Sequence, residues 1–437
     1  MKLRHIYTFI GLLLSFTAWA QVPSPAPAQQ DGIVITGATL HIGNGNVVEQ
    51  GAIAFENGKI LYVGTLADMP VELAELVKVE AHGKHVYPGL ILLNTFLGLE
   101  EISAVNPSKD FRELGTVNPE VRSIIAYNTD SHLTPTNRSN GVLVAQITPR
   151  GGLFPGTSSV VQLDAWNWED AVVKMDEGIH LNWPFPYVGP RWWMGESQAR
   201  ENKSYQKNIE IIEQTLKEAK AYAAKSEVKE INLKLEALKG LFDGSKKLYI
   251  NVDMAKDIIK SVQLVKELGV ENVVLVGVKQ GAYVSEFIKD HNIPCIVERT
   301  HSLPFGEDAS VDSSYDLPNQ LVDAGILVGL AHTGEIMGER NLAFGAGTAA
   351  AFGMEKEEAL QLLTLNNAKI LGIEDQMGSL EVGKDATLLI SEGDLLDMRG
   401  NKVSKAYIQG RDLDLDNKHE MLYRKFKAKY EKKPLVN

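Results

Sequence analysis

A run of four apolar residues at positions 90–93 limits most strongly what this chain can fold into. Pro88 and Gly89 stand directly before the run, and the polar pair Asn94 and Thr95 follows it. A short, unbroken apolar run between turn residues is typical of a strand that is buried on both faces. Strands of this kind occur in parallel sheets that helices cover. The run therefore predicts an α/β fold, with polar side chains where the strand ends.

The N-terminus has the pattern of a secretory signal peptide over residues 1–20. Lys2 and Arg4 precede a short apolar stretch at 9–16, and Ala18 and Ala20 flank Trp19 as a small-x-small cleavage site. A membrane anchor is the alternative, but the apolar stretch is short for a bilayer span. We therefore expect a periplasmic or otherwise extracellular protein, free of the membrane once the signal is cleaved.

Charge and cysteine content restrict the partners of the chain. Removing Lys2 and Arg4 leaves 42 Lys and Arg against 56 Asp and Glu, a net charge of −14. An acidic protein of this kind does not favour nucleic acid or an anionic membrane surface. The single cysteine, Cys295, cannot form an internal disulfide and lies in a run typical of a buried strand.

Two further blocks carry a family resemblance together with the PGLI run at 88–91. Residues 363–372 read LTLNNAKILG, and residues 378–388 read GSLEVGKDATL. In this order and spacing the three blocks resemble the amidohydrolase superfamily, in particular its imidazolonepropionase-like metal-dependent hydrolases. The resemblance implies a TIM-like (β/α)8 barrel beside a composite β-sandwich made from both ends of the chain.

The resemblance also implies the domain boundaries. After the signal peptide we expect a flexible lead-in at 21–31, since that segment is rich in Pro, Ala and Gln. The segments that the resemblance then assigns are the composite sandwich at 32–85 and 378–415, the barrel at 86–377, and a basic tail at 416–437.

In active relatives the first barrel strand ends in His-x-His, and both histidines bind a catalytic metal. Five metal-ligand positions of the family hold other residues here: Asn94, Phe96, Asn251, Gly277 or Val278, and Ala331 or His332. A phenyl ring has no lone pair, and an amide oxygen replaces an imidazole poorly. The resemblance thus predicts a divergent member without the family-type metal site and without a cofactor.

A remodelled site is the alternative. His301 and His332 are expected at the ends of adjacent strands, on the barrel face where such enzymes act. With Glu335 as the carboxylate partner of His332 and Asp308 as that of His301, such a pair could do acid–base chemistry or bind a divalent metal such as zinc. Loop histidines satisfied by ordinary hydrogen bonds are the competing interpretation, and so are capping roles for two nearby carboxylates, Asp253 and Glu298.

Two functions follow from these alternatives. One is an exported binding or partner subunit that has lost catalysis and associates with itself or with a related amidohydrolase. The other is an active hydrolase of C–N bonds in cyclic amides or dipeptide-like substrates, built around His301 and His332. An aromatic loop with Trp183, Trp192 and Trp193 could be a lid over the barrel mouth or a protein contact, and ordinary packing of the loop is an equal alternative.

Overall fold

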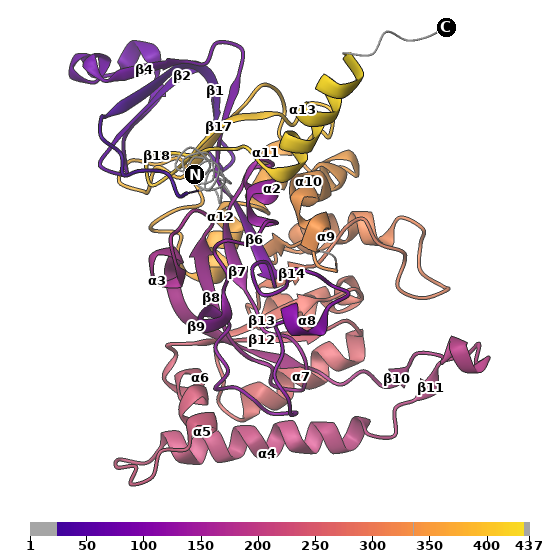
Figure 1. Cartoon of the computed structure of the whole chain (residues 1–437). Helices are drawn as coiled ribbons and strands as arrows, with labels where there is room; N and C mark the ends of the chain where they lie inside the picture. The colour runs from indigo at the N-terminus through magenta and orange to yellow at the C-terminus, as the bar shows by residue number, and fades with distance from the viewer. Residues whose placement is uncertain (1–23, 335, 432–437) are drawn as a thin grey trace, which may run out of the picture.

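The structure is a computed structural model that describes residues 24–334 and 336–431, and the expected signal peptide lies outside these ranges. Figure 1 shows a smaller, sheet-rich lobe above a larger lobe in which helices surround a barrel of strands. Within the described ranges, no helix is both long and apolar enough to cross a bilayer.

The smaller lobe is one eight-stranded sheet that both ends of the chain build together. The N-terminal half supplies β1 (Ile33–His41), β2 (Val47–Glu56), β3 (Lys59–Thr65), β4 (Val77–Glu80) and β5 (His85–Pro88). The C-terminal half supplies β16 (Leu388–Ser391), β17 (Val403–Ile408) and β18 (Arg411–Asp412). The halves join where β5 pairs antiparallel with β16, which confirms the composite organisation. Because β5 ends at Pro88, this lobe extends slightly beyond the expected boundary at residue 85.

The GSLEVGKDATL block lies at the joint between the two halves. Lys59 forms an ion pair with Asp385 at 2.5 Å, and the Ala386 amide donates to the carbonyl of Gly58. These contacts connect the β2–β3 turn to the chain just before β16. The block is therefore recognisable in the sequence because it holds the two ends of the chain together.

The larger lobe is an eight-stranded barrel, as the resemblance implied. Its strands are β6 (Leu90–Thr95), β7 (Val142–Ile147), β8 (Gly156–Gln162), β9 (Val172–Asn182), β12 (Lys247–Val252), β13 (Val273–Gly277), β14 (Cys295–Val297) and β15 (Val328–Leu330). A parallel bridge between Leu93 and Ala331 closes the ring between β6 and β15. Cys295 is buried in β14, and burial raises the pKa of its thiol.

One strand departs from the regular (β/α)8 pattern, because β8 runs antiparallel to both β7 and β9. Connections between parallel strands need about a dozen residues or more, usually with a helix. The segment from Ile147 to Gly156 is shorter than that, so the chain turns back instead of crossing over.

The LTLNNAKILG block closes the barrel seam from outside. It contains α12 (Leu365–Leu371), which packs against β6 and β15. The Asn367 side-chain amide donates to the carbonyls of Ile91 and Leu330 at 2.7 and 3.1 Å. One buried asparagine thus bridges the two edge strands where they are not fully paired.

Helices and irregular segments cover the outside of the barrel (Figure 1). The helices are α2 (Thr134–Arg138), α3 (Trp168–Ala171), α4 (Tyr205–Ala223), α5 (Leu233–Leu238), α6 (Gly240–Asp243), α7 (Ala255–Glu267), α8 (Ser285–Asp290), α9 (Ser313–Asp323), α10 (Leu342–Ala351) and α11 (Lys356–Gln361). The expected tail forms α13 (Lys418–Glu431), whose side chains are not buried.

A hairpin arm leaves the barrel between β9 and α4 and extends away from it (Figure 1). It consists of β10 (Tyr187–Val188), a connection that contains the 3-10 helix Trp192–Met194, and β11 (Arg200–Glu201). At its tip Trp192 and Trp193 are 78% and 66% exposed, whereas Trp183 at its base is buried. The aromatic loop predicted from the sequence is therefore an arm that projects into solvent.

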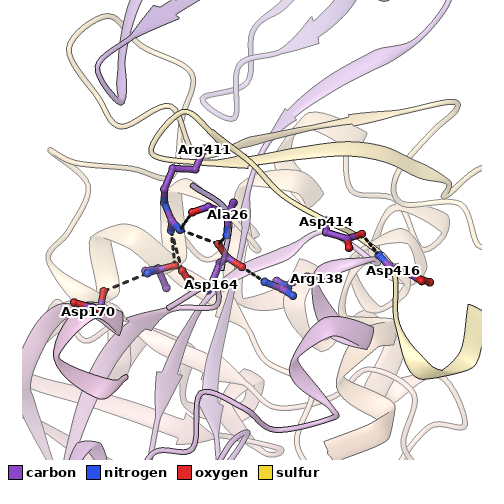
Figure 2. Close-up of polar contacts among 8 residues, drawn as sticks. Ala26, Arg138, Asp164, Asp170, Arg411, Asp414 and Asp416 are labelled. Atoms are coloured by element: carbon purple, nitrogen blue, oxygen red, sulfur yellow. Dashed lines mark hydrogen bonds and ion pairs between the residues drawn. The ribbon is translucent and has the colours of Figure 1, made fainter. Parts of the chain in front are cut away.

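A buried ion-pair cluster fastens the two lobes together (Figure 2). Asp164, just after β8, pairs with Arg138 of α2 and, at 2.8 Å, with Arg411 of β18. The Ala26 amide donates to the same carboxylate at 2.9 Å. Residues 24–31 form no helix or strand, but this contact attaches the lead-in to the barrel.

Candidate functional site at the barrel mouth

The carboxyl ends of the barrel strands carry buried polar side chains, and Asn94 of β6 lies among them. The backbone N–H of Asn94 donates to Gln146 Oε1 at 3.1 Å, and the side-chain Nδ2 of Asn94 donates to Glu298 Oε1 at 3.4 Å. The backbone φ of Asn94 is +53°, in the left-handed region. Asn enters that region more readily than most residues, so the local backbone favours this residue.

One arginine contacts both positions at which the family's first strand carries histidines. Arg150, from the loop after β7, donates through Nη1 to Asn94 Oδ1 at 3.0 Å and through Nη2 to the Asn94 carbonyl at 2.5 Å. Its guanidinium carbon lies 5.6 Å from the centroid of the Phe96 ring, within the range of a cation–π contact. A fixed positive charge therefore lies at the end of β6.

Two carboxyl groups accompany that charge. Burial lowers the pKa of Arg150, and the charges of Glu298 and Glu339 act in the opposite direction. Arginine nevertheless stays protonated in proteins. Glu339 accepts a hydrogen bond from Thr95 Oγ1 at 2.5 Å. Burial raises the pKa of Glu339 to about 8, against smaller effects of Thr95 and Arg150, so this group is mostly neutral at pH 7.

The third and fourth ligand positions of the family are also unsuited to metal binding. At the end of β12, the side-chain amide of Asn251 donates weakly to the Leu181 carbonyl at 3.5 Å. At the end of β13, Gly277 has a φ of +95°, and a Cβ added there would lie 2.5 Å from Asp253 Oδ1. The carboxylate of Asp253 also binds Lys279 at 3.0 Å. A histidine at position 277 would be strained and would collide with that ion pair.

These side chains do not fit a family-type metal. In residues 24–334 and 336–431, no three His, Cys, Asp or Glu side chains lie together as a metal-binding group. The chemistry of the donors agrees, because amide, phenyl and guanidinium groups stand where imidazoles are needed. The positive charge at this end of the barrel comes from Arg150 instead.

The structure brings His301 and His332 near each other. His332, after β15, is buried, and burial lowers its pKa to about 4, with smaller effects from Arg299 and His301. Burial, followed by Arg299, also lowers the pKa of His301. Both imidazoles are therefore mainly neutral at pH 7, and neutral imidazoles can accept protons.

Of the two predicted carboxylate partners, only Asp308 lies within the described residues. His301 Nε2 forms a hydrogen bond with Thr348 Oγ1 at 2.6 Å, and no hydrogen bond joins it to Asp308 among the described residues. Glu335 lies outside the described residues. His301 faces a cleft of about 460 Å³ between α10 and the loop at 394–399 of the smaller lobe. It thus lies beside the barrel mouth, in contact with a helix hydroxyl group.

Several buried polar residues of the barrel escaped the sequence reasoning. Glu177 accepts hydrogen bonds from Gln146, Ser158 and Tyr249 at 2.6–2.8 Å, and burial raises its pKa. His180 stacks on Tyr249 with ring centroids 4.9 Å apart. Neither His180 nitrogen has a hydrogen-bond partner in the part of the chain that the structure describes. Burial, with a contribution from Arg150, lowers the His180 pKa to about 3.

The loop after β7 offered one signal that could have revealed Arg150. In the sequence Pro149-Arg150-Gly151-Gly152, the arginine directly follows a buried strand and precedes two flexible residues. A cation placed there in a barrel reaches the carboxyl-end face, where functional side chains gather.

Comparison with known proteins agrees with the architecture. The sequence model of the amidohydrolase family matches residues 204–413. The crystal structure of an amidohydrolase from Thermotoga maritima superposes with a TM-score of 0.76 at 24% identity, covering 87% of this chain and 99% of that one. The chain is thus similar to the amidohydrolase family in sequence over just under half of its length, and it shares the fold of the Thermotoga maritima protein. The matched range omits β6, the strand that carries Asn94 and leads into Phe96.

Two further solved structures and one curated protein are also similar to the chain. Molinate hydrolase has a TM-score of 0.55 at 14% identity, with 89% of this chain and 96% of that chain covered. A zinc-bound adenosine deaminase from Xanthomonas campestris has a TM-score of 0.53 at 15% identity, with coverage of 93% and 99%. A 5-methylthioadenosine/S-adenosylhomocysteine deaminase from Teredinibacter turnerae is 34% identical over 82 residues, which span 16% of this chain and only 18% of that relative.

Proposed function

We propose that this protein is an exported binding or partner subunit of the amidohydrolase superfamily that does not carry out the family's metal-dependent hydrolysis. One observation carries the proposal. The Arg150 guanidinium binds both oxygens of Asn94 and lies over Phe96, at the two positions that hold metal-binding histidines in active relatives.

The chemistry of a guanidinium explains why this replacement opposes hydrolysis. A catalytic zinc binds a water molecule directly and lowers its pKa to about 7, so that hydroxide forms at neutral pH. A guanidinium can donate hydrogen bonds, but it has no open coordination position for water. The neighbouring Glu339 is mostly neutral at pH 7 and is a poor proton acceptor there. The barrel end therefore retains a positive charge and lacks the activated nucleophile.

The arm supports the partner part of the proposal. Trp192, Trp193 and Met194 are exposed together at its tip. Glu196 binds Arg200 at 3.0 Å and also pairs with Arg191, so charged contacts flank the aromatic tip. Tryptophan and arginine are enriched in the energetically important parts of protein interfaces. A second copy of the chain or a related amidohydrolase is the proposed partner.

A second candidate is hydrolysis of C–N bonds in cyclic amides or dipeptide-like substrates. It is favoured by the two neutral imidazoles of His301 and His332, of which His301 lines a cleft of about 460 Å³. A neutral imidazole can act as a general base without a metal, although zinc could bind if further ligands approach. The intact family fold supports this candidate only weakly, because a fold hosts many functions.

Metal content distinguishes the two candidates. The purified mature protein is offered zinc, manganese and iron, and bound metal is measured by elemental mass spectrometry after gel filtration. We expect metal only at background level, in the parent and in His332→Ala alike. One tightly bound equivalent that His332→Ala or His301→Ala loses would overturn the proposal. It would justify a screen of Xaa-Pro dipeptides and cyclic amides for activity that needs the same histidines.

A further inference from the structure

The side chain of Arg150 takes a position that is unusual for a charged residue in a loop. Charged side chains of surface loops normally extend into water, and arginine is rarely buried without partners. Here the side chain reaches the barrel end and is surrounded by four residues, which we call the cation cradle: Asn94, Phe96, Glu298 and Glu339.

The cradle matches a flat organic cation. Asn94 offers its carbonyl and side-chain oxygens to two different nitrogens of the same guanidinium. Paired acceptors of this kind suit the fixed fork of N–H donors in a guanidinium. The ring face of Phe96 attracts a delocalised cation, whereas it offers no lone pair to a divalent metal.

Charge completes the match. Glu298 supplies the negative charge that favours the charged form of Arg150 at pH 7, whereas Glu339 is mostly neutral there, and both residues come from the far side of the barrel seam. Glu298 follows β14 and also accepts a hydrogen bond from Asn94 Nδ2 at 3.4 Å. Glu339 belongs to the 3-10 helix Ile336–Asn341 and binds Thr95. The cradle therefore draws its residues from the end of β6 and from two other segments of the barrel end.

We propose that the cation cradle is a binding site for guanidinium-type cations, and that the chain fills it with its own Arg150 side chain. The positive charge of the family's metal is thereby supplied from within the polypeptide. Arg150 fills the cradle in the parent chain, and the cradle would accept a small guanidinium compound when that side chain is removed. The proposal stands on the contacts of Arg150 and is independent of whether the chain is catalytic.

Chemical rescue tests this site. The variant Arg150→Ala is made in the full chain, and its melting temperature is measured with millimolar methylguanidinium chloride, with the same concentration of sodium chloride, and with zinc chloride. We expect the variant to melt below the parent. Methylguanidinium should raise its melting temperature by about 2 °C or more, saturating with concentration, because a ligand that binds only the folded state stabilises it.

Two controls isolate the cradle. Arg112→Ala removes an exposed arginine that also lies over a phenylalanine ring, 5.9 Å from the Phe111 centroid, and it should gain nothing from methylguanidinium. Adding Glu298→Gln to Arg150→Ala should weaken the rescue at least several-fold in midpoint concentration, since one attractive charge is lost.

Each outcome decides the proposal. Equal responses of Arg150→Ala, Arg112→Ala and the parent to methylguanidinium would overturn it. Stabilisation of Arg150→Ala by zinc in place of methylguanidinium would also overturn it, and would show a metal site that Arg150 blocks. If Arg150→Ala does not fold, Arg150→Lys and Arg150→Gln are compared instead. The proposal requires the lysine variant to melt higher, and equal melting would contradict it.

Discussion

Glu339 is a buried carboxyl group whose proton depends on folding. Its pKa is about 8 in the folded chain because of burial, well above the ordinary value of 4.5. A carboxyl group with a raised pKa contributes stability that is fully present below pH 4.5 and is lost as the pH rises through 8. Burial also raises the pKa of Glu177, so both carboxyl groups contribute to the pH dependence of stability in the parent protein.

The variant Glu339→Gln should therefore change the pH dependence of stability. Glutamine cannot ionise, so the variant should gain stability relative to the parent as the pH rises from about 5 to about 8. Melting temperatures recorded across this range would measure the gain. Glu113→Gln, at an exposed position, is the control and should stay parallel to the parent. If the melting temperatures of Glu339→Gln and the parent instead changed in parallel with pH, Glu339 would be charged in the folded state.

At the scale of elements, the end of β13 shows how the backbone itself excludes a family residue. Gly277 has a φ of +95°, and Val278 follows with a φ of +49°. Side chains other than hydrogen are strained in this region. A histidine at position 277 would therefore be disfavoured by the backbone conformation as well as by the contact with Asp253.

Gly277→Ala tests that constraint. We expect a loss of about 1–3 kcal/mol in the free energy of unfolding, because strain and a close contact with Asp253 Oδ1 add together. Gly383→Ala is the matched control, since its φ is +89° and no atom lies within 4 Å of the added Cβ. Urea unfolding of both variants should give the larger loss at 277. Equal losses would show that backbone strain alone accounts for the effect.

For the whole molecule, the Arg138–Asp164–Arg411 cluster is the principal buried ionic link between the lobes in Figure 2. Removing the carboxylate leaves two guanidinium groups with little solvent and without their shared partner. Breaking a buried ion pair by deleting one member typically costs about 3–5 kcal/mol. Exposed pairs contribute much less, about 0–1 kcal/mol, because water screens them.

Asp164→Ala should consequently lower the free energy of unfolding by about 3–5 kcal/mol. Asp412→Ala removes the carboxylate of the half-exposed Lys405–Asp412 pair and serves as the control, with an expected change below about 1 kcal/mol. Urea denaturation followed by tryptophan fluorescence measures both. A small effect of Asp164→Ala would mean that the lobes are held mainly by apolar contacts.

The sequence predicted the architecture better than the site, for physical reasons. Apolar runs such as 90–93 and the blocks at 363–372 and 378–388 encode buried strands and the joints between segments, which local patterns reveal. The reversal of β8 depends on the length of one loop. The position of Arg150 depends on which loop residue reaches the barrel end, and only the three-dimensional structure decides that. The same holds for His301, whose partner is Thr348 of a helix and not the nearby Asp308.

The pairing of β5 with β16 also sets the order of events during synthesis. Pro88 lies opposite Leu388 in the completed sheet, so about 300 residues are made between the two partners. At typical elongation rates of about 5–20 residues per second, this takes roughly 15–60 seconds. During that interval the first half of the sheet has an unpaired edge next to an unfinished barrel. The smaller lobe, although it contains the earliest residues, becomes complete only after the barrel has been synthesised.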